Sequence, residues 1–463
     1  MNYISTRGGL EPVGFQDAVL MGLADDGGLL IPESIPNVSD QLDAWRELPY
    51  GELVAEVLRP FAPDIPKSDL KELAGRTYGK AFQPQVAPMV HLGDLHILEL
   101  WHGPTLSFKD VALQFLGNLF EYILEHRGGR LNILGATSGD TGSAAIRSVR
   151  GRDGINIFIM HPRGRVSPIQ ERQMTAVLDQ NVHNIAVEGS FDDCQRIMKA
   201  LAGDLAFKRQ YSLGAVNSVN WARVVAQIVY YFHGAFAVQK ISGADRVRFC
   251  VPTGNFGDIL AGWYALRMGL PVSQLILATN ENDILSRFFN TGQYSLGQVH
   301  QTLSPAMDIQ VASNFERYLY YKVGCDAGRL RDLMDQFDAD HSLRVEVGED
   351  GVVDPAFVAG AGSREQCLGT IRKYHEQYDY LLDPHTAVGV SVAERCGPAG
   401  DPVICLATAH PAKFPEAIRQ ATGRDLARHA AIDDMAGLPT RCQILPNDKE
   451  AVRKYIVKVI GER

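Results

Sequence analysis

Six short, nearly continuous apolar runs constrain the fold of this chain more than any other feature of its sequence. Each run has strand character, and stretches with helical character separate one run from the next. Strands that are apolar at nearly every position are buried on both faces, which is typical of parallel sheets covered by helices. The sequence therefore predicts an α/β architecture. The runs are residues 132–135, 155–160, 184–187, 247–251, 275–278 and 403–407.

The length of the chain, 463 residues, exceeds what one hydrophobic core usually covers, so we expect two or three lobes. Residues 1–90 are rich in glycine, proline and acidic side chains, and 53–58 has an amphipathic helical pattern. We interpret residues 1–90 as a small N-terminal domain. Residues 91–463 would carry the α/β part of the molecule.

The charge balance argues against a surface for nucleic acid or anionic membranes. Acidic residues outnumber basic ones by 54 to 45, whereas those partners select clustered lysine and arginine. The most membrane-like stretch, 224–238, is too short to span a bilayer and contains Gln227 and His233, so it predicts a buried helix. Residues 1–8 lack the apolar core of a signal peptide, and we expect a cytoplasmic protein.

The seven cysteines are scattered, odd in number and free of Cys-x-x-Cys pairs. This spacing is unlike that of a zinc site or a disulfide framework. We therefore expect buried free thiols in a reducing compartment, and no metal centre.

In open parallel sheets, ligands bind beyond the carboxyl ends of the strands, and three such loops here have unusual chemistry. The first, 135–145, reads Gly-Ala-Thr-Ser-Gly-Asp-Thr-Gly-Ser-Ala-Ala. Its small residues and hydroxyls suit the approach of an anion to backbone N–H groups at the start of a helix. Its glycine spacing matches neither the dinucleotide nor the Walker pattern, so a tight turn without a ligand is an equal alternative.

The second loop, 252–258, reads Pro-Thr-Gly-Asn-Phe-Gly-Asp and precedes a helical stretch over 259–268 that Gly269 ends. A strand, a glycine loop and a helix in this order form a cradle for phosphate. The alternative is a turn selected only for its backbone. Asp258 opposes the phosphate interpretation, because its carboxylate would repel the anion unless it points away as a helix cap.

The third loop, 101–110, ends in Ser-Phe-Lys-Asp. Ser107 and Asp110 have the spacing of a capping box, which predicts a helix that starts near Phe108. Lys109 would then lie in the first helical turn, where the helix dipole disfavours an ammonium group and so favours the neutral amine that imine formation requires. Taken alone, the motif favours the alternative that Lys109 is one more exposed helical lysine, which is the usual position of this residue type.

The segment Ser107-Phe108-Lys109-Asp110 resembles the surroundings of the cofactor lysine in fold-type II pyridoxal-phosphate enzymes, the tryptophan synthase β family. Within that group the chain resembles the threonine synthase family along nearly its whole length. The resemblance implies two α/β lobes around parallel sheets, a small N-terminal domain, and inserts around 288–379. The segments that carry it, in the family's order, are 3–8, 26–29, 136–142, 217–220, 252–257, 304–309, 383–389 and 407–414.

The resemblance implies that the cofactor is pyridoxal 5′-phosphate, bound as an imine to Lys109. The same lysine would act as the catalytic base once substrate has displaced it. Backbone amides of the second loop would hold the cofactor phosphate. The residues of that cradle are Gly254, Asn255, Phe256 and Gly257.

Two further residues would meet the cofactor ring. Thr408 would face the pyridine nitrogen, and a hydroxyl there leaves the nitrogen largely unprotonated, which is compatible with elimination. Asp140 stands where relatives commonly have asparagine beside the 3-oxygen of the cofactor. An ionised carboxylate cannot donate a hydrogen bond, so this contact is in question.

The implied substrate is O-phospho-L-homoserine, converted with water into L-threonine and phosphate. Such a substrate needs a second anion site, and Arg223 offers a bidentate guanidinium for it. The alternative for Arg223 is a surface arginine on a helix. The residues expected to bind substrate are Ser138, Thr141, Asn217, Ser218 and Arg223.

Two other functions stay open. One is another fold-type II lyase such as a serine or threonine dehydratase, against which the N-terminal domain and the segment 217–223 argue. The other is a non-catalytic homologue that binds cofactor, against which an intact Lys109 argues. We expect a small-molecule substrate and a monomer or homodimer. No role is assigned to His385, His410 and Lys413, which could be structural.

Overall fold

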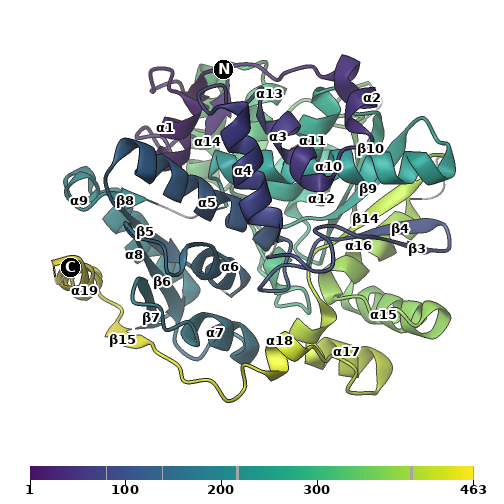
Figure 1. Cartoon of the computed structure of the whole chain (residues 1–463). Helices are drawn as coiled ribbons and strands as arrows, with labels where there is room; N and C mark the ends of the chain where they lie inside the picture. The colour runs from purple at the N-terminus through teal and green to yellow at the C-terminus, as the bar shows by residue number, and fades with distance from the viewer. Residues whose placement is uncertain (80, 138, 215–217, 350, 397–399, 462–463) are drawn as a thin grey trace.

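Two separate sheets organise the chain (Figure 1). In the computed structural model, which describes residues 1–461 except 80, 138, 215–217, 350 and 397–399, one sheet has six strands in the order β13-β10-β9-β14-β4-β3. The other has five strands in the order β15-β7-β6-β5-β8. We call the parts built around them the large lobe and the small lobe. The two lobes confirm the predicted α/β architecture around parallel sheets.

The large sheet is parallel except at its edge, where β3 pairs antiparallel with β4. The runs predicted at 247–251, 275–278 and 403–407 are strands β9, β10 and β14. Alternate residues of these strands enter two core clusters, one on each face of the sheet. The strands are β3 (Met89–Leu92), β4 (Leu95–Glu99), β9 (Val247–Pro252), β10 (Val272–Thr279), β13 (Phe357–Ala361) and β14 (Val403–Ala407).

Helices cover both faces of the large sheet. Helix α10 is buried along most of its length, as predicted for 224–238. Among the described residues, no helix is long and apolar enough to cross a membrane. The helices of one face are α5 (Lys109–Arg127), α10 (Trp221–Ser242) and α11 (Gly257–Arg267), and those of the other are α15 (Arg364–Tyr378), α16 (Pro384–Arg395) and α17 (Pro415–Thr422).

All strand pairs of the small sheet are parallel. The runs predicted at 132–135, 155–160 and 184–187 are strands β5, β6 and β7. The strands are β5 (Leu131–Ala136), β6 (Ile155–Pro162), β7 (Val182–Glu188), β8 (Leu213–Gly214) and β15 (Gln443–Pro446), and the helices are α6 (Asp140–Val149), α7 (Pro168–Thr175), α8 (Phe191–Ala202) and α9 (Leu205–Gln210).

The N-terminal residues pack onto the large lobe and share its core. The hydroxyl of Tyr3 donates to the carbonyl oxygen of Phe61 at 2.6 Å and accepts from Nε1 of Trp221, at the start of α10, at 3.0 Å. The elements of this region are β1 (Tyr3–Ser5), α1 (Phe15–Met21), β2 (Leu30–Pro32), α2 (Leu42–Trp45), α3 (Tyr50–Leu58) and α4 (Lys67–Tyr78).

The region of the expected inserts adds a helical layer and a two-stranded sheet to the large lobe. Its elements are α12 (Ile284–Thr291), β11 (Gln293–Ser295), α13 (Phe315–Lys322), α14 (Ala327–Asp340) and β12 (Ser342–Arg344). All seven cysteines are free thiols, but the expectation that they are buried holds for only four of them: Cys396 and Cys442 are partly exposed, and Cys325 is exposed.

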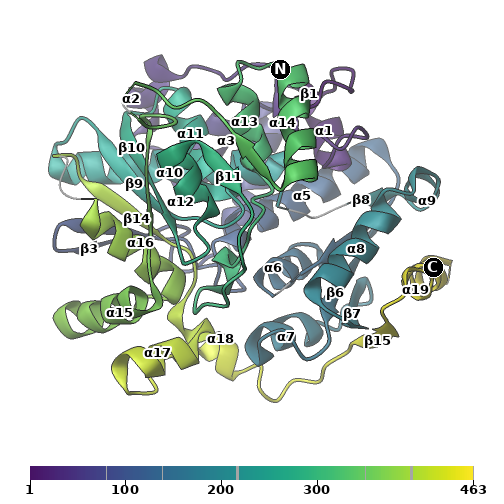
Figure 2. The ribbon, with the colours of Figure 1, turned by 180° about the vertical axis from the view of Figure 1, so that it is seen from behind.

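The C-terminal segment crosses from the large lobe to the small lobe (Figure 1). After α17 and the short helix α18 (Ala430–Asp433), the chain adds β15 to the edge of the small sheet beside β7. Helix α19 (Lys449–Gly461) then packs against α8, as the rear view also shows (Figure 2). The small lobe is therefore built from two distant parts of the sequence.

Candidate active site

One cavity brings together all three loops that the sequence singled out. It encloses about 720 Å³, including space open to solvent. Ser138 and Asn217, two of the expected substrate ligands, lie outside the described residues. The other expected site residues all line this cavity: Lys109, Asp140, Thr141, Ser218, Arg223, Gly254, Asn255, Phe256, Gly257 and Thr408.

Helix α5 begins at Lys109, so the predicted start of the helix is confirmed, but the predicted capping box is wrong. The Asp110 carboxylate turns back to Thr105 and accepts from its N–H at 2.7 Å and from its hydroxyl at 2.9 Å. No side chain caps the helix at Phe108. The nearby Thr105 donors occupy the carboxylate that a capping box would have used.

The Lys109 amine is largely enclosed, since its side chain is only 13% exposed. Burial lowers the pKa of Lys109, the Asp140 carboxylate opposes this, and the cations Lys413 and Arg223 add to the lowering. A lysine with a lowered pKa keeps more of its nucleophilic neutral form, which an imine-forming amine needs. The alternative of an exposed helical lysine is wrong.

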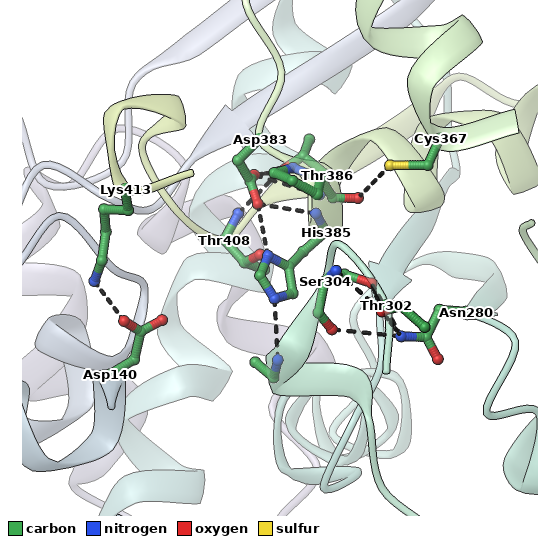
Figure 3. A network of polar contacts seen from close by, with 12 residues as sticks. Asp140, Asn280, Thr302, Ser304, Cys367, Asp383, His385, Thr386, Thr408 and Lys413 are labelled. Carbon is green, nitrogen blue, oxygen red and sulfur yellow. Dashed lines mark hydrogen bonds and ion pairs between the residues drawn. The ribbon is translucent and has the colours of Figure 1, made fainter. Parts of the chain in front are cut away.

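Asp140 is held by a lysine to which the sequence assigned no role. Its Oδ1 lies 2.6 Å from Nζ of Lys413 and accepts from Nε2 of Gln170 at 2.7 Å, while Oδ2 lies 4.0 Å from Nζ of Lys109. Figure 3 shows Lys413 and Asp140 pointing toward each other. Burial alone would raise the pKa of Asp140, but Lys413 and Lys109 outweigh it and hold the pKa below its usual range.

The position of Lys413 in the sequence contains a signal by which it could have been found. It lies in the short 3-10 helix Pro411–Lys413 just beyond the end of β14, where ligands gather in parallel sheets. Applied to the loop after β14, that rule could have selected Lys413. Its side chain is fully buried, and Nζ also donates to the carbonyl oxygen of Thr105 at 2.9 Å.

The glycine loop after β9 forms a concave backbone surface at the start of α11. Phe256 has a left-handed conformation with φ of 63°, and Gly257 begins the helix. A Cβ atom on Gly254 would lie 2.4 Å from the carbonyl oxygen of Ala306, so only glycine fits there. Successive N–H groups at such a turn and helix start form a site for an anion.

The sequence allowed Asp258 to act as a cap of helix α11, but it does not do so in the structure. Its Oδ1 accepts from the hydroxyl groups of Tyr230 at 2.5 Å and Tyr231 at 2.9 Å, both on α10. Burial raises the pKa of Asp258 to about 6, against the opposing effect of the two hydroxyl groups. The carboxyl group is thus turned toward α10 and is easier to neutralise than an exposed one.

Thr408 lies directly after β14, and a chain of polar contacts supports it (Figure 3). Its N–H donates to Oγ1 of Thr386 at 3.2 Å, and the Thr386 hydroxyl donates to Asp383. Asp383 also lies 2.8 Å from Nδ1 of His385. His385, to which no role was assigned from the sequence, also lines the cavity with Thr408.

Arg223 lies in the first turn of α10 and is buried, so the surface-arginine alternative is wrong. Burial lowers its pKa to about 10, which leaves the guanidinium charged at neutral pH. His410 does not line the cavity. Its ring packs between Trp101 and His429, and burial lowers its pKa to about 4.

A buried amine, a backbone anion cradle and a hydroxyl at the end of the neighbouring strand fit the aldehyde, phosphate and ring nitrogen of pyridoxal 5′-phosphate. A family model described as pyridoxal-phosphate dependent enzyme matches residues 87–347. The fold and the site thus define a pyridoxal-phosphate enzyme of fold-type II, and its cofactor is pyridoxal 5′-phosphate.

Two more family models match the ends of the chain: the threonine synthase N terminus at residues 2–78 and the threonine synthase C-terminal model at 386–456. A threonine synthase of Pseudomonas aeruginosa is 48% identical over 461 residues, covering 98% of each chain. One of Schizosaccharomyces pombe is 47% identical over 91% of this chain and 89% of its own. A crystal structure of PLP-bound threonine synthase from Brucella melitensis matches with a TM-score of 0.94 and 44% identity, covering 99% of each chain. The chain belongs to the threonine synthase family.

Proposed function

We propose that this chain converts O-phospho-L-homoserine and water into L-threonine and phosphate. The observation that carries the proposal is a buried, charged Arg223 on the cavity that also holds Lys109 and the glycine cradle. The cradle is suited to the cofactor phosphate, and a second cationic group from a different helix is suited to a second phosphate. A substrate that carries its own phosphate needs both.

The bound cofactor supplies an electron sink that stabilises negative charge at the substrate Cα. The remaining work belongs to the chain. Lys109 holds the cofactor and then, as an amine, removes one proton each from Cα and Cβ of the substrate, and phosphate leaves Cγ. Protons are then returned to Cγ and Cα, and water adds its hydroxyl group at Cβ and gives its proton to the phosphate released. The lowered pKa of Lys109 favours the neutral amine that can accept those protons.

The other residues bind and orient. The N–H groups of the loop from Gly254 to Gly257 hold the cofactor phosphate, and Thr408 contacts the pyridine nitrogen. Arg223 binds the substrate phosphate, with Ser218 and Thr141 available for it or for the substrate carboxylate. Ser138 and Asn217 remain proposed ligands on sequence grounds.

A serine or threonine dehydratase is not favoured. The relatives that are 47–48% identical to this chain are threonine synthases, and the family models at both ends of the chain are those of threonine synthase. The test is to incubate the purified, cofactor-loaded protein with O-phospho-L-homoserine, and separately with serine and threonine. We expect equal amounts of phosphate and threonine from the first substrate. Keto-acid release from serine or threonine, without threonine formation from phosphohomoserine, would contradict the proposal.

A further inference from the structure

The contact between Lys413 and Asp140 joins the two lobes beside the cofactor lysine. Lys413 follows β14 in the large sheet, and Asp140 begins α6 of the small lobe. Both side chains are buried, and their closest atoms are 2.6 Å apart. The carbonyl oxygen of Thr105 accepts hydrogen bonds from both lobes. One comes from Nζ of Lys413, in the large lobe, at 2.9 Å, and the other from Nε2 of Gln173, on α7 of the small lobe, at 3.2 Å.

The same carboxylate faces both lysines, but unequally. Lys413 makes a direct ion pair with Oδ1, whereas Lys109 lies 4.0 Å from Oδ2, beyond hydrogen-bond distance. The negative charge of Asp140 is therefore already matched by one buried cation before Lys109 is considered. A second ammonium group near this pair would meet the repulsion of Lys413 as well as the attraction of Asp140.

We propose that Lys413 is a positioning residue that occupies the Asp140 carboxylate, so that Lys109 is left as a neutral amine able to capture the cofactor. The inference rests on Lys109 being the cofactor lysine. Lys413 does not line the cavity and reaches the reacting atoms only through Asp140. The other charged groups that act on Lys109 are Arg223, which also favours the neutral amine, and Asp258, which opposes it.

The test measures the proton affinity of Lys109 directly. The full-length protein, freed of cofactor, is acylated at a series of pH values, and the modification of Lys109 is quantified by mass spectrometry. In Lys413→Met the freed carboxylate should pair with Lys109, so its reactivity at pH 8 should fall by about three- to tenfold. Asp140→Asn should shift reactivity the opposite way, and Lys413→Arg should restore the wild-type profile.

A spectroscopic readout on the cofactor-loaded protein complements the labelling. The pH at which the visible absorbance changes should rise in Lys413→Met and fall in Asp140→Asn. Lys413→Gln removes the charge but keeps a donor for Asp140, and it carries the test if the methionine variant does not fold. Gln170→Leu is the matched control, since it removes the other partner of Asp140 Oδ1 without changing any charge.

The outcomes separate this inference from the proposed function. An unchanged Lys109 profile in a folded Lys413→Met or Lys413→Gln variant overturns it, as does an equal shift in Gln170→Leu. If the cofactor is instead found attached to another lysine, the assignment of Lys109 fails whatever the labelling profile shows.

Discussion

The ring of His385 accepts a hydrogen bond at Nε2 from the backbone N–H of Ala306, across 3.2 Å. Its Nδ1 therefore carries the proton and donates to Asp383 at 2.8 Å. The carbonyl oxygen of the same Ala306 is the atom that leaves no room for a side chain at Gly254. His385 thus holds the loop that encloses the glycine cradle.

Replacing His385 by alanine should loosen that loop and weaken cofactor binding. Loss of one buried hydrogen bond costs about 1–3 kcal/mol, so the dissociation constant of the cofactor should rise by about fivefold or more. His385→Asn, which keeps a polar group, should lose less. Titration of the cofactor absorbance measures the effect, and equal affinity in the wild type and the alanine variant would show that His385 does not support the cradle.

Reduction of the cofactor-loaded protein with borohydride should remove its visible band and fix the cofactor to Lys109. The enclosure and lowered pKa of that amine are the reasons for this expectation. Peptide mapping by mass spectrometry identifies the modified residue. A label on any other lysine would overturn the central assignment of the site.

Thr408→Asp should place a carboxylate opposite the pyridine nitrogen of the cofactor and so raise the pKa of that nitrogen. Side reactions such as transamination should then increase relative to threonine formation. Thr408→Ser, which keeps the hydroxyl, is the matched control. The ratio of transamination product to threonine is measured together with cofactor affinity. If this ratio stays at the wild-type value while affinity is normal, Thr408 does not contact the pyridine nitrogen.

Arg223→Lys keeps a charge but loses the bidentate fork, which should cost about 1–3 kcal/mol of substrate phosphate binding. Arg223→Ala should weaken turnover of phosphohomoserine much further. Both variants should retain the visible spectrum, because the cofactor cradle lies on a different element. Steady-state kinetics and cofactor titration test this in parallel. If Arg223→Ala loses cofactor instead, the arginine serves the other phosphate.

Asp258 should make stability depend on pH. The pKa of Asp258 is 3.8 in the unfolded chain and about 6 in the folded protein. Below pH 3.8 the carboxyl group is protonated in both states, so its ionisation does not lower the free energy of unfolding. As the pH rises to about 6 the unfolded state releases its proton first, and the folded state loses up to about 3 kcal/mol, a loss that is complete above that pH.

Asp258→Asn removes this titration. The stability of the variant relative to the wild type should therefore increase between pH 4 and pH 6 and stay level above it. Unfolding of the cofactor-free proteins at several pH values measures the difference. A difference that is constant over this range would mean that the carboxyl group has an ordinary pKa in the folded state.

The sequence predicted the elements that depend on local pattern. The six apolar runs became strands because both faces of a covered parallel sheet require apolar side chains. The loops after β4 and β9 meet because these two strands end at the same edge of the large sheet, whereas the loop after β5 reaches the cavity from the small sheet. Residues whose roles depend on strand order were harder to place. Lys413 reaches Asp140 only because two separate sheets meet, which no local pattern encodes.

Competition between nearby polar groups explains other differences. Asp110 has the spacing of a capping residue, but its carboxylate instead accepts hydrogen bonds from the N–H and the hydroxyl group of Thr105. Asp258 could have capped α11, but its carboxylate instead accepts hydrogen bonds from the hydroxyl groups of Tyr230 and Tyr231 on the neighbouring helix α10. In both cases the sequence identified a side chain in need of partners and could not show which partners would be closest.

Strand β15 completes the small sheet from the far end of the chain, and this has a consequence for synthesis on the ribosome. Strands β5 to β7 emerge early, but the edge of β7 that β15 covers must stay open until nearly the whole chain has been made. Open strand edges attract other chains. We therefore expect nascent chains that stop before β15 to be prone to aggregation, even though they already contain every residue of the cavity.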